Sequence, residues 1–230
     1  MFEYFLIYNF FILYFSFDIV YYLLENYKNF KNIYPVHKKW YVVSNLSKSL
    51  ILGFYSIECL SILYNLYFYN LWDNQRILFL GSIYSSIDLV SIIRVPKLAN
   101  STLLHHIIVN ILFLYTVSNN MLYNSFSRLI AIYAVYSTLS FLVNFYLSLR
   151  IIYNNNYNIK ILSTICLSNY TICCIFNWTY QIYHTLLTSF YINNYGFIRV
   201  IAYIIILSFI IIDDLILIKH LYNNSFLKIS

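Results

Sequence analysis

Long apolar stretches separated by short polar ones run along the whole chain. A helix needs about 20 residues to cross a bilayer, and seven stretches of the sequence meet or approach that length. We place these spans at residues 1–24, 44–69, 77–95, 102–118, 127–149, 161–189 and 197–219. The sixth is longer than one crossing requires, which predicts a tilt or a kink there. The first begins with Glu3 and lacks the positively charged start and the small-residue cleavage site of a signal peptide, so we expect a retained helix or signal anchor.

Local signals mark the boundary between the third and fourth spans. Pro96 ends the third, because proline removes a backbone donor and disfavours helix in the residue before it. Ser101 or Thr102 can cap the fourth, since a side-chain hydroxyl accepts from an unpaired amide at a helix start. We therefore predict a tight turn over residues 96–101.

Composition excludes a soluble protein. With 61% hydrophobic and 10% charged residues, a chain of 230 residues could not bury its apolar surface in a globule. Unbroken apolar runs with only 3 Gly and 2 Pro favour helices over a transmembrane barrel. The predicted fold class is all-α, a polytopic membrane protein. We divide it into a first helix and basic cytosolic loop (1–40), a six-helix membrane domain (41–220) and a short cytosolic tail (221–230).

The basic residues predict the topology. Seven alternating spans would put eleven Lys and Arg residues on one side of the membrane and three on the other. The eleven are Lys28, Lys31, Lys38, Lys39, Lys48, Arg94, Lys97, Arg150, Lys160, Lys219 and Lys228, and the three are Arg76, Arg128 and Arg199. Because positive residues accumulate in cytoplasmic loops, we expect a cytosolic C-terminus. The formal net charge of +6 includes no basic run long enough to indicate binding of nucleic acid.

Several common chemistries find no support in the sequence. The four cysteines fall inside apolar stretches, which is typical of small core side chains rather than of disulfides or a zinc site. All five Asn-x-Ser/Thr sequons lie in a span or on the cytosolic side, so we expect no N-glycan. The chain has no Ser-His-Asp order, no Gly-rich phosphate loop and no C-x-x-C.

Five ionisable residues fall at similar depths near the predicted cytosolic face. At 1.5 Å rise per residue, Asp88 lies about 10 Å deep and His105 and His106 lie roughly 5 to 6 Å deep. Asp213 and Asp214 lie about 8 to 9 Å from the same face. Because ionisable side chains are costly in lipid, such residues usually face a bundle interior or a wet cavity. The five therefore predict a site.

A histidine beside a carboxylate is held in one tautomer and made more basic, as a general base requires. Asp88 is the candidate orienting partner. Neighbouring helix positions point about 100° apart, so one of His105 and His106 would work while the other supports it. Alternatively, the pair simply lies at a helix mouth and bonds to backbone or lipid head groups. A metal is not expected, because the ligand spacing H-x-x-x-H is absent.

Glu58 falls in the middle of the second span, where a charge is most costly. Two alternatives remain open for it. It could be protonated and hydrogen-bonded as plain structure, or it could line a lipid cavity together with Asp213 and Asp214.

The stretch from the third to the fifth span resembles the TLC-domain family, which includes the ceramide synthases. The resemblance rests on Asp88-Leu89, on a basic linker before Leu103-Leu104-His105-His106, and on Ser137-Thr138 followed by Leu149-Arg150. It covers roughly residues 40–220. Ceramide synthases continue past the His pair with an Arg-Gly step and a second polar group, whereas here IIVNILFLYTVSNN follows. The chain is closer to the short, non-synthase members of the family.

The resemblance implies a TLC-type bundle in the endoplasmic reticulum that acts on membrane lipids. Our leading hypothesis is a lipid-handling protein, in sphingolipid or membrane-lipid homeostasis, with His105, His106 and Asp88 at the mouth of a cytosol-facing cavity. The first alternative is a ceramide-synthase-type N-acyltransferase, with acyl-CoA as its co-substrate and no other cofactor. The second is a non-enzymatic trafficking or chaperone component. Membrane lipids are the expected partners.

Overall fold

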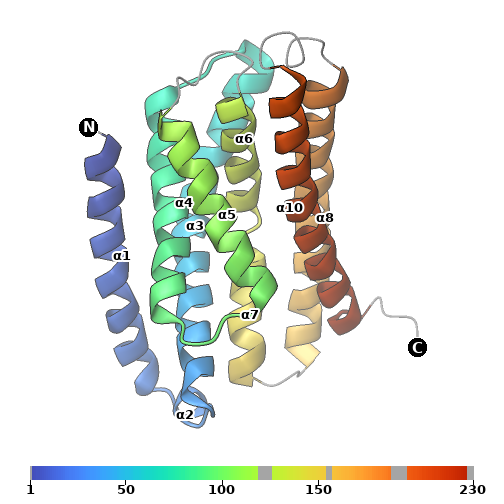
Figure 1. Cartoon of the computed structure of the whole chain (residues 1–230). Coiled ribbons are helices and arrows are strands. Elements are labelled where there is room, and N and C mark those ends of the chain that lie inside the picture. The colour runs from blue at the N-terminus through green and yellow to red at the C-terminus, as the bar shows by residue number, and fades with distance from the viewer. Residues whose placement is uncertain (1, 119–125, 154–156, 188–195, 227–230) are drawn as a thin grey trace.

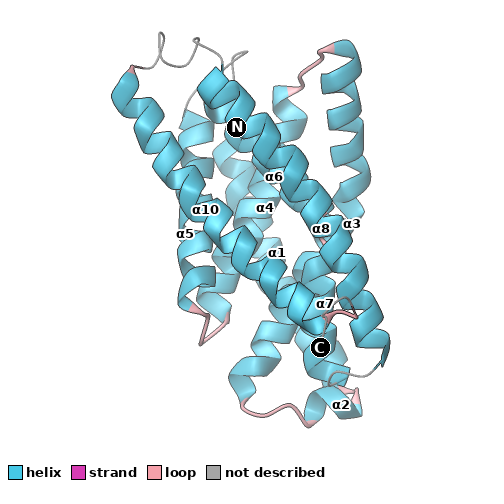
Figure 2. Cartoon of the chain, turned by 90° about the vertical axis from the view of Figure 1, so that its right-hand side faces the viewer, coloured by secondary structure: helices cyan, strands magenta, loops and turns pink. Residues whose placement is uncertain are grey.

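Helices form along the long apolar stretches of the sequence in the computed structural model, which describes residues 2–118, 126–153, 157–187 and 196–226. The elements are α1 (Phe2–Glu25), α2 (Lys28–Lys31), α3 (Val36–Tyr69), α4 (Asn74–Arg94), α5 (Asn100–Ser118), α6 (Phe126–Leu139), α7 (Leu142–Tyr153), α8 (Tyr157–Ile182), the π-helical η1 (Tyr183–Leu187) and α10 (Phe197–Asn224). Helices are joined by short loops, and the described residues contain no strand (Figure 2).

The long helices stand side by side and alternate in direction (Figure 1). Six of the helices are long and apolar enough to cross a membrane, and the number is seven if α6 and α7, which meet at an angle of 42°, are counted as one span. The all-α, multi-pass fold is therefore confirmed. One end of the bundle holds α2, the turn between α4 and α5, and the last turns of α7 and α10 (Figure 1). We call it the α2 end.

The second span begins earlier than predicted. Helix α3 starts at Val36 rather than at residue 44, so part of the basic stretch is helical. Lys39 lies in this added part of the helix, where its Nζ is 2.7 Å from Glu25 Oε1 and 5.3 Å from the centre of the Phe30 ring. Helix α3 therefore continues across the boundary that we expected at residue 40.

A break that the sequence did not predict lies in the fifth span. Helix α6 ends at Leu139 and α7 begins at Leu142. Thr138 Oγ1 donates to the Ala134 carbonyl at 2.9 Å, and Ser140 Oγ donates to the Tyr136 carbonyl at 3.2 Å. Such bonds to the carbonyl four residues back compete with the helix ladder and bend helices. The long sixth span instead changes to π-helix over Tyr183–Leu187.

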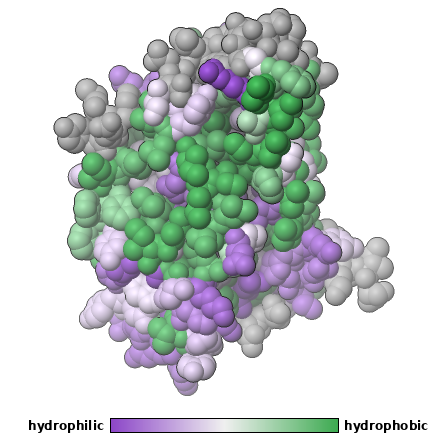
Figure 3. All heavy atoms as spheres, viewed as in Figure 1, coloured by the Kyte–Doolittle hydropathy of each residue, from purple (hydrophilic) through white to green (hydrophobic). Residues whose placement is uncertain are grey.

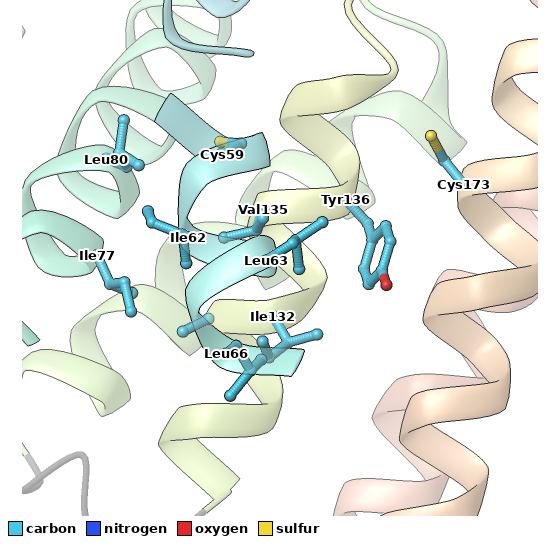
Figure 4. Close-up of a cluster of buried hydrophobic side chains, with 11 residues drawn as sticks. Cys59, Ile62, Leu63, Leu66, Ile77, Leu80, Ile132, Val135, Tyr136 and Cys173 are labelled. Atoms are coloured by element: carbon cyan, nitrogen blue, oxygen red, sulfur yellow. The ribbon is translucent and has the colours of Figure 1, made fainter. Parts of the chain in front are cut away.

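Apolar side chains fill the interior between the helices. One cluster joins α3 to α4, α6 and α8 (Figure 4), with Cys59, Ile62, Leu63, Leu66, Ile77, Leu80, Ile132, Val135, Tyr136 and Cys173 among its members. A second joins α1 to α3 and α4 and includes Leu13, Phe17, Val42 and Ile87. The first helix therefore packs as part of the bundle.

Apolar side chains also cover the outside. Residues such as Ile57 and Phe54 are 76% and 75% exposed. Figure 3 shows apolar side chains across the middle of the face in view, with polar side chains gathered at the α2 end. Soluble proteins rarely expose so large a continuous apolar surface, whereas a bilayer accommodates one. The surface agrees with an integral membrane protein.

Candidate functional site: a polar cavity near the α2 end

A cavity of about 340 Å³ lies near the α2 end between α3, α5, α7 and α10. We call it the polar cavity. Its ionisable lining residues are Lys48, His105, His106, Arg150, Asp213, Asp214 and His220, and its neutral polar lining includes Tyr41, Asn45, Tyr84, Ser137, Asn144 and Tyr170. Four of the six candidate site residues, the two histidines and the two adjacent aspartates, thus form part of the cavity wall.

Asp88 lies behind that wall and is completely buried. Its Oδ1 is 3.1 Å from His106 Nδ1 and also forms an ion pair with the ammonium group of Lys48 from α3. The ring nitrogen is within ion-pair distance but is not aligned for a hydrogen bond. The same ammonium lies 4.7 Å from the centre of the Tyr84 ring. Asp88 therefore holds the position of a lysine and a histidine that both line the polar cavity.

The other histidine has an aspartate of its own. His105 Nδ1 lies 3.1 Å from Asp213 Oδ2 on α10, again at ion-pair distance without hydrogen-bond alignment. The two imidazoles are 6.0 Å apart at their centres and inclined by 78°. Within the described part of the chain, Nε2 of each ring has no hydrogen-bond partner. This nitrogen is not fully buried in either ring, so it is accessible. Each ring can thus take or release a proton at Nε2 while a carboxylate faces Nδ1.

Asp214 has a different environment from its neighbour. Its Oδ2 accepts hydrogen bonds from Tyr133 Oη at 2.8 Å and from Trp178 Nε1 at 3.0 Å, and its Oδ1 accepts one from Tyr170 Oη at 2.6 Å. These donors come from α6 and α8, so one buried carboxylate joins three helices. Asp214 stabilises the wall of the polar cavity, and Asp213 is the aspartate that faces a histidine.

Small polar side chains let the helices approach closely at this depth. Ser44 of α3 and Ser91 of α4 lie 2.7 Å apart at their hydroxyl oxygens, and Ser85 donates to Asn110 of α5 at 2.8 Å. Serines on facing helices permit close backbone contact and bond across the interface in lipid. This packing brings Asp88 of α4 within reach of its partners on α3 and α5.

A narrow apolar pocket of about 60 Å³ lies farther from the α2 end, between α4, α5, α6 and α10. Gly81 lines it, and a Cβ at that position would come 3.0 Å from the Phe113 ring. Tyr84 lines both this apolar pocket and the polar cavity. Tyr133 also lines the apolar pocket, and its hydroxyl bonds to Asp214 in the wall of the polar cavity. A polar and an apolar compartment are therefore neighbours.

Glu58 is not among the residues that line the polar cavity. It forms an ion pair with Arg76 near the start of α4, and the two side chains are 34% and 43% exposed. This pairing differs from both alternatives that the sequence left open, because the antiparallel packing of α3 and α4 supplies a cation. Among the described residues, no group of three His, Cys, Asp or Glu side chains is arranged to hold a metal ion.

Sequence reasoning missed several members of the site. Lys48 was counted only as a topology charge, although it falls four residues inside the second predicted span and the rule applied to Asp88 also applies to it. Arg150 and His220 stand at span ends, where interfacial positions are ordinary. The aromatic donors Tyr133 and Tyr170 carried no signal, because the sequence contains 27 tyrosines.

The fold and the site together define a multi-pass helical membrane protein with an ionisable cavity near one end of its bundle. Comparison of the chain with models of known protein families, with characterised proteins and with solved structures gives no match. The TLC-like features therefore rest on the residues quoted from the sequence.

Proposed function

We propose that this chain is a TLC-like membrane protein that binds a lipid, with the lipid's polar group beside His105 and His106 and its hydrocarbon chain toward the apolar pocket. The observation that carries the proposal is the position of Tyr84, which lines both compartments. An amphiphile is the ligand class that matches a polar and an apolar compartment in contact with each other.

Size and charge support this proposal. A volume of about 340 Å³ falls within the range of small-molecule sites, which begins at about 300 Å³. Ionisable side chains inside a membrane protein commonly mark a substrate pathway or a wet cavity. The positive-inside bias supports a cytosolic position for the α2 end and for the polar cavity near it. A role in sphingolipid or membrane-lipid homeostasis at the endoplasmic reticulum follows from the resemblance.

The test is to purify the protein from membranes and to identify the bound lipids by mass spectrometry. Gly81→Leu fills the apolar pocket and should lower the amount of copurified lipid. Gly53→Leu is the matched control, because a Cβ at Gly53 also meets an aromatic ring at 3.0 Å, that of Phe141, outside the apolar pocket. Equal lipid content in wild type and both variants would contradict the proposal.

The alternative function is N-acyl transfer, favoured by the two His–Asp contacts. One imidazole would take the proton of an amine as its nitrogen attacks the thioester carbonyl of acyl-CoA, and would return that proton to the departing thiolate as the C–S bond breaks. The test is lipid analysis of cells that lack endogenous ceramide synthase and express either wild type or His105→Ala with His106→Ala. New ceramides made only by wild type would establish the enzyme. Their absence, with a copurified lipid, would favour binding.

A further inference from the structure

A cationic group faces the polar cavity from its α7 wall. Arg150, in the last turn of α7, lines the cavity, and its guanidinium contacts Nε2 of His220 from α10. Asn224 Nδ2 also faces that ring nitrogen, at 3.5 Å. Because both neighbours are donors, Nε2 is an acceptor and the His220 imidazole is neutral. His220 thus orients Arg150 without compensating its charge.

Arg150 has no carboxylate partner in the described part of the chain. Seven of the chain's eight acidic side chains are described, and none of them pairs with it. The eighth, that of Glu3, lies outside the described side chains. In the polar cavity, Asp213 faces His105 and Asp214 accepts from three aromatic donors. An arginine that faces a cavity inside a helical membrane bundle normally has a counter-charge.

We propose that Arg150 binds the phosphate group of an amphiphilic ligand in the polar cavity. This inference rests on the proposed function and names its ligand class. The guanidinium fork matches phosphate and carboxylate geometry, and its bond to His220 uses one of five N–H donors. The amide of Asn144, two turns earlier on α7 and also lining the cavity, is a further donor. Tyr41, whose hydroxyl is another donor, also lines the cavity. Several hydrogen-bond donors near one cation favour phosphate over carboxylate, because phosphate offers more oxygen acceptors.

The competing explanation is electrostatic and unspecific. A cation in the last turn of a helix interacts favourably with the helix dipole and with any anionic bilayer surface. Lys97→Gln removes a positive charge from the same end of the bundle at an exposed loop position that does not line the polar cavity. It is therefore the matched control for Arg150→Gln.

The experiment measures binding to the full-length protein in nanodiscs of neutral phosphatidylcholine. The probes are palmitoyl lysophosphatidate, monopalmitoylglycerol, palmitate and inorganic phosphate. We expect lysophosphatidate to bind at least about tenfold more tightly than monopalmitoylglycerol, as a charge-assisted contact allows. Arg150→Gln should abolish this difference, Arg150→Lys should retain part of it, and Lys97→Gln should leave it unchanged. Each variant is first checked for wild-type elution on size exclusion.

The outcomes separate this inference from the proposed function. Equal binding of lysophosphatidate and monopalmitoylglycerol would overturn the phosphate site and leave lipid binding intact. Palmitate binding as tightly as lysophosphatidate would overturn the choice of phosphate. An equal loss in Lys97→Gln and Arg150→Gln would assign the effect to the membrane surface and overturn the site. Arg150-dependent binding of inorganic phosphate, with no amphiphile bound, would support the anion site while contradicting the proposed function.

Discussion

Removing the ammonium group of Lys48 should destabilise the protein strongly. In Lys48→Met the side chain keeps its length and loses its charge, and Asp88 keeps only the contact with His106 at 3.1 Å. The side chains of the original pair are 9% and 0% exposed. Breaking a buried ion pair by removing one partner costs about 3 to 5 kcal/mol. Because the histidine remains, we expect about 3 kcal/mol less free energy of unfolding.

The assay is reversible unfolding in mixed micelles of a mild detergent and dodecyl sulfate, followed by circular dichroism. A double-mutant cycle isolates the pair. Asp88→Asn alone leaves Lys48 without its counter-charge, and the two substitutions together remove both charges. We expect the double variant to lose about 2 kcal/mol less than the sum of the single losses.

The matched control is Lys39→Met on the same helix. Lys39 pairs with Glu25 at 2.7 Å, but the Glu25 side chain is 32% exposed and can be solvated when the lysine is removed. Its loss should be far smaller than that of Lys48→Met. Additive single losses at Lys48 and Asp88, or equal losses at Lys48 and Lys39, would refute the view that a buried ion pair holds α3 to α4.

Three further predictions concern other parts of the bundle. Asp214→Leu leaves three buried donors without an acceptor and should lower the free energy of unfolding by at least about 3 kcal/mol in the same assay. Asp214→Asn should lower it less, and equal losses in the two variants would contradict this role of Asp214. Gly81→Ala brings a Cβ against the Phe113 ring and should lower the free energy of unfolding by about 1 kcal/mol. Adding Phe113→Leu should restore this loss, and no restoration would refute the contact. A membrane-impermeant maleimide should label Lys97→Cys from the cytosol and Trp72→Cys only after full solubilisation, and the reverse pattern would invert the predicted topology.

The span pattern is predictable from sequence because hydropathy and helix-end signals are local. The fourth span was predicted at 102–118 and forms at Asn100–Ser118. The break after Leu139 was not predicted, because it depends on hydroxyl bonds from Thr138 and Ser140 within the helix, which mean hydropathy does not register. The early start of α3 at Val36 was not predicted, because the first turns of this helix contain basic residues and mean hydropathy marks only its apolar part.

The sequence predicts the depth of the site residues in the bundle, but not which of them form pairs. Rise per residue places Asp88 and the two histidines at similar depths. Which aspartate meets which histidine depends on how the helices are rotated and on which helices are neighbours. Asp88 therefore pairs with His106, while His105 meets Asp213 from the last helix. Partners that come from helices distant in sequence cannot be read from spacing.

Photocrosslinking with a diazirine-bearing fatty acid fed to cells tests the central claim most directly. If a lipid chain occupies the apolar pocket, peptide mapping should find adducts on Phe113 and Leu207, which line it and are 8% and 6% exposed. Excess unlabelled lipid should compete for these adducts, because the sites are saturable. Adducts confined to outward-facing residues such as Ile111 and Phe209, which are 59% and 53% exposed, would show only bilayer contact and would contradict a lipid site inside the bundle.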